Sequence, residues 1–456
     1  MTDAPGTIGA GEAPGILQQP YRWLSLGMFA LIFLAAFETL AVTTVMPLVA
    51  DELDGWSLYA VAFAMPLAAG IVGMVVAGNW SDRSGPVRPL VAASIVWLVG
   101  VLIAGTATTM ETLVAGRFVH GIGGAAVIVP LYVIVARVYP ERLRAKVFAG
   151  FAAAWVIPSI VGPALAGVIA EATSWHWVFL GVLLLIVPVA PLVLRPLRRE
   201  RAHLGGDPSV AWSASRIAWS VLTAVAALGF GLAKELPTPW AAITAIAALV
   251  VVAVSVRALV PAGTLVARRG MPAVVLVRTI VAAAFFATEV YLPALFRQEY
   301  GMAPALAGAV LTGAGVSWAI ASWLQGRLPH VSNASIVRIG SATLAVALVI
   351  VFTVAFFAWH PAVAFVAWSV AGFGMGLMYP RFSVAVLELS PKAAQGFNTS
   401  ALTIGESLGA SAAIAGTALA ASAVSARAFT PEFAVTVVLA VVAVVLAPRV
   451  RPVASD

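Results

Sequence analysis

The chain has 456 residues, of which 62% are hydrophobic and only 10% are charged, and its mean hydropathy is +1.02. Soluble domains carry roughly 25% charged residues, so a water-soluble fold of this size is excluded and lipid must cover most of the surface. There is no cysteine, which excludes disulfides and thiolate chemistry, and the five histidines are scattered, which predicts no metal site.

Apolar stretches of about 20 residues follow one another along the chain, and each is long enough to cross a hydrocarbon core of about 30 Å as a helix. Residues 1–20 are rich in Gly and Pro and predict a disordered cytoplasmic tail. The run after it is too long for a signal peptide. We expect fourteen membrane helices, at 22–46, 57–78, 88–107, 110–138, 147–170, 176–194, 214–233, 238–258, 271–296, 304–325, 335–358, 361–387, 396–424 and 430–448.

The net charge of +7 is explained by membrane topology rather than by nucleic-acid binding. Basic residues gather in alternate loops, for example Arg83 with Arg88, Arg195 with Arg198, and the tail within 449–456. This pattern predicts that both termini are cytoplasmic and that the chain is a multi-pass protein of the plasma or inner membrane.

The loop after the second helix reads GNWSDRSGPVR from Gly78. It resembles the signature Gly-x-x-x-Asp-Arg-x-Gly-Arg-x-Arg of the major facilitator superfamily, with Pro86 in place of one basic residue. Glycine at the first position permits close helix approach, glycine before Pro86 permits a tight turn, and the acid can pair with a cation to latch this side closed. The alternative is a loop whose arginines only set topology. The matching residues, Gly78, Asp82, Arg83, Gly85 and Arg88, form a predicted gating motif.

Arg117 lies inside the fourth helix, where a charge is costly unless it is paired or hydrated. This segment resembles the superfamily motif whose arginine is implicated in proton transfer. The alternative is an arginine that extends to the outer interface. His120 is one turn away on the same face, and we interpret it as a hydrogen-bonded packing histidine.

The fifth helix carries Pro158, Gly162, Pro163 and Gly167, which resemble the motif that distinguishes antiporters within the superfamily, although the family usually has Gly or Ala at the first position. Small residues allow tight helix contact, and the prolines favour a bend. Ordinary small-residue packing is the alternative.

A weak internal repeat relates the two halves of the chain. GIGGAAVIVP at 121–130 is similar to GFGMGLMYP at 372–380, an offset of 251 residues. The predicted organisation is a six-helix bundle at 21–194, a linker with two extra helices at 195–270 and a second bundle at 271–448. This all-α arrangement resembles the fourteen-helix drug:proton antiporters.

Three acids lie inside predicted spans. Glu38 is the expected proton carrier, tuned by Arg117; it could instead serve only as a structural ion-pair partner. Glu289, related to Glu38 by the 251 offset, and Glu406 are expected to favour cationic substrates. Glu289 could instead be solvated near the outer end, and Glu406 could pair with Arg278 to lock the halves. Aromatic residues expected to stack on a ligand are Trp155, Trp318, Phe285, Phe286 and Tyr291.

These features predict a proton-coupled antiporter that exports lipophilic small molecules, cationic ones among them, by alternating access. The expected partners are the small-molecule substrate, protons and the lipid bilayer. We expect a monomer that binds no nucleic acid and uses no cofactor beyond the proton gradient. The sequence has no Walker-type phosphate loop, which excludes direct use of ATP. The alternatives are an exporter of an endogenous lipid or metabolite, or a multi-spanning membrane enzyme.

Overall fold

The computed structural model describes residues 15–200, 204–233, 236–237, 240–328, 331–389, 395–423 and 429–451. Most of the predicted N-terminal tail and residues 452–456 of the C-terminal tail lie outside this part. In the described part, the regular structure consists of helices alone, fourteen of them α-helices. Their bounds are α1 Arg22–Glu52, α2 Tyr59–Ser84, α3 Val87–Gly105, α4 Met110–Val138, α5 Glu141–Ala172, α6 His176–Arg199, α7 Ala214–Leu232, α8 Trp240–Ser255, α9 Met271–Tyr300, α10 Pro304–Gly326, α11 Asn333–Phe357, α12 Pro361–Leu389, α13 Gln395–Ala423 and α14 Thr430–Leu446.

Twelve of the described helices are long and apolar enough to cross a membrane, and α7 and α8 hold shorter apolar stretches, at Ala214–Phe230 and Ile243–Ala258. The predicted all-α fold with fourteen helices is therefore confirmed. The predicted and observed helix ends differ by a few residues. Several helices continue past their apolar run into polar residues, such as 79–84 of α2.

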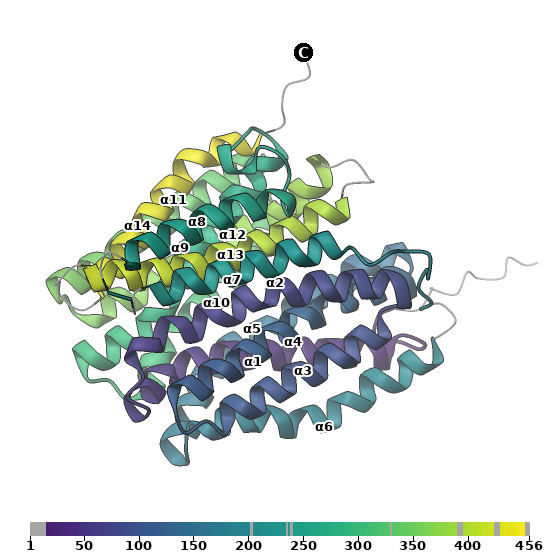
Figure 1. The fold of residues 1–456 in the computed structure, drawn as a ribbon, viewed down its shortest axis with the longest axis horizontal. Helices are drawn as coiled ribbons and strands as arrows, with labels where there is room; N and C mark the ends of the chain where they lie inside the picture. Colours follow the sequence, from purple (N-terminus) through teal and green to yellow (C-terminus); the bar gives the residue numbers. More distant parts are fainter. Residues whose placement is uncertain are drawn as a thin grey trace, which may run out of the picture.

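The helices form two bundles with the same internal packing. In the first, α1 packs on α5 and α6, and α4 packs on α2 and α3. In the second, α9 packs on α13 and α14, and α12 packs on α10 and α11. Each helix of α1–α6 thus has its counterpart eight helices later, so the repeat inferred from the glycine clusters is a repeat of structure. Figure 1 shows the two bundles side by side, with their helices roughly aligned.

The bundles meet along two seams, one between α5 and α10 and one between α2 and α13. The inserted helix α7 packs against both α2 and α13, and α8 packs on α7. In Figure 1, α7 follows the boundary between the bundles. The extra pair therefore covers the second seam instead of extending either bundle.

Two ends of the molecule can be distinguished. The C-terminal end of α1 contacts the C-terminal end of α9, where the Asp51 carboxylate pairs with the Arg297 guanidinium at 2.8 Å. The start of α9 meets the end of the chain, where Gly270 donates to the Arg449 carbonyl. Because α1 and α9 both end at the Asp51–Arg297 pair, α1 begins on the same side of the molecule as the start of α9 and the end of the described chain. We call this side the termini end, and the opposite side, with Asp51 and Arg297, the far end.

The bundles are joined in the half of the molecule toward the far end. The Tyr59 hydroxyl donates to the Val290 carbonyl at 2.8 Å, and the Ala305 amide donates to Glu171 at 3.0 Å. Near mid-depth the Thr312 hydroxyl donates to the carbonyl of Ile160 at 3.0 Å. These bonds, with the Asp51–Arg297 pair, hold the far end closed.

Nearer the termini end the bundles leave accessible space. Tyr132 of α4 is 42% exposed, although it lies within electrostatic range of Arg278 and Glu406 in the other bundle. A side chain between two packed bundles would be covered. The described bundles are thus joined at the far end, and Tyr132 remains accessible nearer the termini end.

Candidate transport site

Glu38 in α1 is the centre of a buried charged cluster. Its Oε1 lies 2.9 Å from Nη1 of Arg117, and its Oε2 lies 2.8 Å from Nε2 of His120. The side chains of Glu38 and Arg117 are 1% and 7% exposed. The guanidinium also donates through Nε to the carbonyl of Ala62 at 3.3 Å. An acid buried this deeply is stable as an ion only with such partners.

The cluster follows from helix geometry, because residues three apart on α4 share one face and both reach the same point on α1. Arg117 does not extend to the interface, since it is buried and paired, so that alternative is wrong. For His120 the expectation is a hydrogen-bonded packing histidine, and its Nε2 does face a polar partner, the Glu38 carboxylate. The sequence did not identify which residue that partner is.

Glu289 in α9 is partly buried and, among the described residues, has no ion-pair or hydrogen-bonding partner. Its position corresponds to Glu38, but the position that corresponds to Arg117, 251 residues later, is Trp368. Trp368 is fully buried and stacks on Phe285, with ring centroids 4.4 Å apart. The second bundle therefore carries an aromatic pair where the first has a cation, which leaves the Glu289 carboxyl without a cationic partner among the described residues.

Arg278 and Glu406 form a second ion pair. Nη2 of Arg278 lies 2.6 Å from Oε2 of Glu406, and its guanidinium sits 4.4 Å from the ring centroid of Tyr379. The pair forms as anticipated, but α9 and α13 belong to one bundle. It therefore cannot lock the two halves together.

The five predicted ligand-stacking aromatics do not form one surface. Phe285 is buried and lies 5.5 Å from Phe286 and 5.6 Å from Trp318, centroid to centroid, so these three make a cluster beside Glu289 on α9 and α10. Trp155 on α5 is 43% exposed. Tyr291 is buried at the far end, 6.0 Å from the ring of Tyr59, where it contributes to closure rather than to a midspan surface.

The predicted antiporter motif lies on α5 along the seam with α10. Helix α5 runs without a break through Pro158 and Pro163. A Cβ atom added at Gly167 would overlap the backbone of Ala305, so only glycine allows this approach. A Cβ at Gly162 would lie 3.6 Å from the Phe37 ring, an ordinary contact, so tight packing at Gly162 is not required.

The predicted gating motif lies at the termini end, bound to the linker that leads into α7. Arg83 donates to the Val210 carbonyl at 3.0 Å, and the Asp207 amide donates to the Asp82 carbonyl at 2.9 Å. In the linker, the amide and hydroxyl of Ser209 donate to the Asp207 carboxylate, which holds the pKa of that carboxyl below its usual range.

Gly85 turns the chain with φ 79° and ψ 162°, a conformation adopted essentially by glycine alone. A side chain there would also overlap the carbonyl of Leu204. The expectation of close helix approach at Gly78 is wrong, because an added Cβ would meet only Val129, at 3.6 Å. Asp82 and Arg88 are exposed, and the Asp82 carboxylate makes no ion pair with another described residue. The motif is therefore held by the linker in this state.

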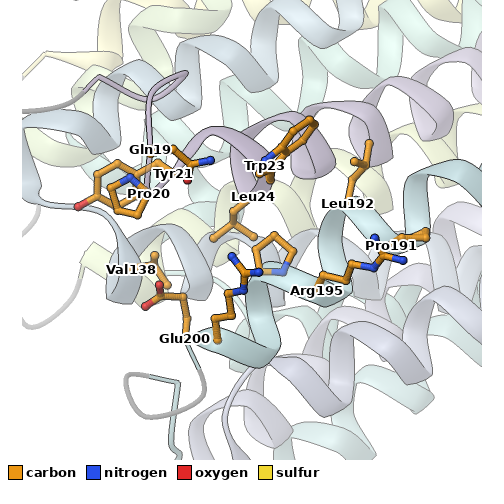
Figure 2. A pocket seen from close by; sticks show the side chains of 12 residues that line it. Gln19, Pro20, Tyr21, Trp23, Leu24, Val138, Pro191, Leu192, Arg195 and Glu200 are labelled. Carbon is orange, nitrogen blue, oxygen red and sulfur yellow. The ribbon is translucent and has the colours of Figure 1, made fainter.

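A cavity of about 440 Å³ is shown in Figure 2. It lies at the termini end between residues 19–24 and the last turns of α4 and α6, with Arg195 and Glu200 at its wall. None of the three acids Glu38, Glu289 and Glu406 lines it, so we assign no role in transport to it.

Two repeated six-helix bundles around buried charges in apolar helices define a multi-pass membrane transporter, not an enzyme. The chain belongs to the Major Facilitator Superfamily, whose model matches residues 28–414.

Curated relatives include Multidrug resistance protein 3 of Bacillus subtilis, which is 31% identical over 162 residues, 36% of this chain and 32% of the relative. An MFS-type transporter of Metarhizium majus is 27% identical over 313 residues, 65% of this chain and 53% of the relative. The matches thus span about a third to a half of these relatives.

Solved structures with the same fold include a peptide transporter of the POT family in complex with sulfate, with a TM-score of 0.67, 15% identity and coverage of 93% of this chain and 94% of that one. A POT family transporter in complex with 5-aminolevulinic acid has a TM-score of 0.65 at 16% identity, with the same coverage of both chains. At this identity the likeness concerns the fold.

Proposed function

We propose that the protein is a proton-coupled antiporter of the plasma or inner membrane that exports lipophilic small molecules, with a preference for cations. The observation that carries the proposal is the pairing of Glu38 with Arg117 and His120. The relatives named for multidrug resistance or efflux support the choice of cargo.

Coupling follows from competition for the Glu38 carboxylate. As an anion it holds both basic side chains; after it takes a proton, their attraction to it is lost and the α1–α4 contact loosens. A proton can thus change the packing of the first bundle. Arg117 also holds the α2 backbone through Ala62, which connects the proton site to a helix of the α2–α13 seam.

Preference for cations follows from Glu289. Glu406 has Arg278 beside it, so this pair adds no net charge. Glu289 lacks such a partner among the described residues, and the aromatic cluster of Phe285, Phe286 and Trp318 lies on the same side of the bundle. A lipophilic cation would satisfy the carboxylate and bury its apolar surface against these rings.

The test is proton flux in proteoliposomes, with ethidium as the lipophilic cation and an internal pH dye as the readout. Wild type should move protons when ethidium is added, and Glu38→Gln should bind ethidium without moving protons. Glu299→Gln, an exposed acid of α9, serves as the control. Undiminished coupling in Glu38→Gln would reduce Glu38 to a structural partner of Arg117. A rate of ethidium transport that does not change with the pH gradient would refute antiport.

A further inference from the structure

A second cavity, of about 220 Å³, lies at the far end and spans the junction of the two bundles. Trp56 and Tyr59 line it from the first bundle, and Tyr291, Phe429 and Glu432 line it from the second. The remaining wall is made of alanines. The cavity is distinct from the Glu38 cluster and from Glu289, none of whose residues lines it.

Four aromatic rings form a continuous wall of this cavity. The ring centroids of Trp56 and Tyr59 are 4.8 Å apart, those of Tyr59 and Tyr291 are 6.0 Å apart, and those of Tyr291 and Phe429 are 5.9 Å apart. The Tyr59 hydroxyl is engaged by the Val290 carbonyl, and the Tyr291 hydroxyl accepts from Thr417 at 3.3 Å. The phenol oxygens are thus already bonded to protein, so the two tyrosines line the cavity chiefly with their rings.

Glu432 supplies an acidic group. It is 7% exposed, and its Oε2 has no hydrogen-bond partner among the residues that the structure describes. It stands in the first turn of α14, where the helix dipole favours a carboxylate but gives this oxygen no bond. Arg297, which also lies at the far end, is paired with Asp51. Burying an unpaired carboxyl oxygen is costly, and a cationic ligand would compensate the ionised acid, so this oxygen in an aromatic cavity points to a ligand.

Trp56 is held in place by the same ion pair that joins the bundles. Its indole nitrogen donates to Oδ1 of Asp51 at 2.8 Å, while Oδ2 of Asp51 pairs with Arg297 at 2.8 Å. The aromatic wall is therefore complete only while the far end is closed. Opening of this end would separate Trp56 and Tyr59 from Tyr291, Phe429 and Glu432.

We propose that this cavity binds a small alkylammonium ion of the size of tetramethylammonium or choline, and that the bound ion holds the far end closed. A quaternary ammonium is attracted to aromatic faces and to a carboxylate at once, and it needs no hydrogen-bond donor. Because the ion is bound by both bundles, it acts as an inhibitor that must leave before the far end can open. This inference goes beyond the proposed function, since it needs neither proton coupling nor a particular cargo.

The first test is calorimetric titration of the purified full chain with tetramethylammonium chloride, against sodium chloride at equal ionic strength. Wild type should show saturable binding, and tetrabutylammonium, too large for 220 Å³, should not. Glu432→Gln and Trp56→Leu should each weaken binding at least tenfold, and Glu299→Gln, at an exposed acid of α9, should leave it unchanged. Two variants from different bundles are used so that a folding defect in one does not decide the result.

The second test measures ethidium export from proteoliposomes with tetramethylammonium present on the far-end side. Export by wild type should fall as the ion saturates, and Glu432→Gln should remain active at the same concentration. Absence of saturable binding overturns the proposal, and so does binding that both cavity variants retain. Binding lost in Glu289→Gln alone would place the ion in the central cavity and refute the far-end site, whatever the outcome for proton coupling.

Discussion

Nη1 of Arg117 lies 2.9 Å from Oε1 of Glu38, and the two side chains are 7% and 1% exposed, so the two charges depend on each other. Removing one charge of such a pair strands the other, at a cost of roughly 3–5 kcal/mol. We expect Glu38→Gln and Arg117→Gln each to lower the unfolding temperature clearly. The double variant should lose less than the sum, because neither charge is then stranded.

Thermal unfolding in detergent checks this expectation. Asp51→Asn, which breaks the Arg297 pair at a side chain that is 46% exposed, is the control and should cost no more than about 1 kcal/mol. Strictly additive losses in the Glu38/Arg117 double variant would show that the two side chains stabilise the fold independently.

Glu289→Gln should reduce export of cations while sparing neutral compounds of similar size. The physical reason is that Glu289 has no cationic partner among the described residues, so a bound cation could pair with its carboxylate, whereas Glu406 is already paired with Arg278. We expect at least a tenfold loss in apparent affinity for ethidium, about 1.4 kcal/mol. Initial export rates over a range of concentrations measure it. Equal losses for cationic and neutral cargo would argue against charge recognition.

Gly167→Ala should weaken closure of the far end, and Gly162→Ala should not. Both residues belong to the same motif on α5, but an added methyl overlaps the Ala305 backbone only at Gly167; at Gly162 it reaches an ordinary 3.6 Å from Phe37. Spin-label distances between Asp54 and Met302, each replaced by cysteine, should lengthen in Gly167→Ala. The chain has no native cysteine to interfere. Unchanged distances would mean that the α5–α10 seam adjusts without opening.

Thr44→Cys combined with Gly308→Cys should form a disulfide between the bundles. A Cβ built on Gly308 lies 3.1 Å from Cβ of Thr44, close to the separation of about 3.5–4.5 Å that a disulfide needs. Oxidation should cross-link the protein and stop export, and a reductant should restore it. Thr44→Cys paired with Gly326→Cys, at the opposite end of α10, is the control. Export that continues in the fully cross-linked protein would rule out separation of the bundles here.

Gly85→Ala should detach the linker from the motif loop, because it forces a side chain into a conformation that costs about 1–3 kcal/mol and overlaps Leu204. Gly78→Ala, in the same motif, meets only an ordinary contact and should be nearly neutral. Faster amide hydrogen exchange across residues 204–213 reports the detachment. Similar exchange in the two variants would contradict the role given to Gly85.

Hydropathy and repeat spacing were enough to predict the helices, because lipid leaves a chain few alternatives to apolar helices. An ion pair between Glu38 and Arg117 could be anticipated because both residues lie inside predicted membrane helices, where a charge needs a partner. The helical spacing places His120 on the same face as Arg117, but spacing within one helix does not identify Glu38 of another helix as its partner. The docking of residues 204–213 on the gating motif, and the place of Tyr291 in the far-end wall, depend on side-chain directions and backbone contacts between distant segments, and no local pattern encodes them.

Helix α7 packs on both α2 and α13 and so covers one of the two lines along which the bundles part (Figure 1). Because α7 contacts a helix of each bundle along this seam, it blocks entry of lipid molecules between α2 and α13. A compound dissolved in the bilayer would therefore enter between the bundles only along the α5–α10 seam. The inserted helix pair would thus make lateral access from the membrane asymmetric.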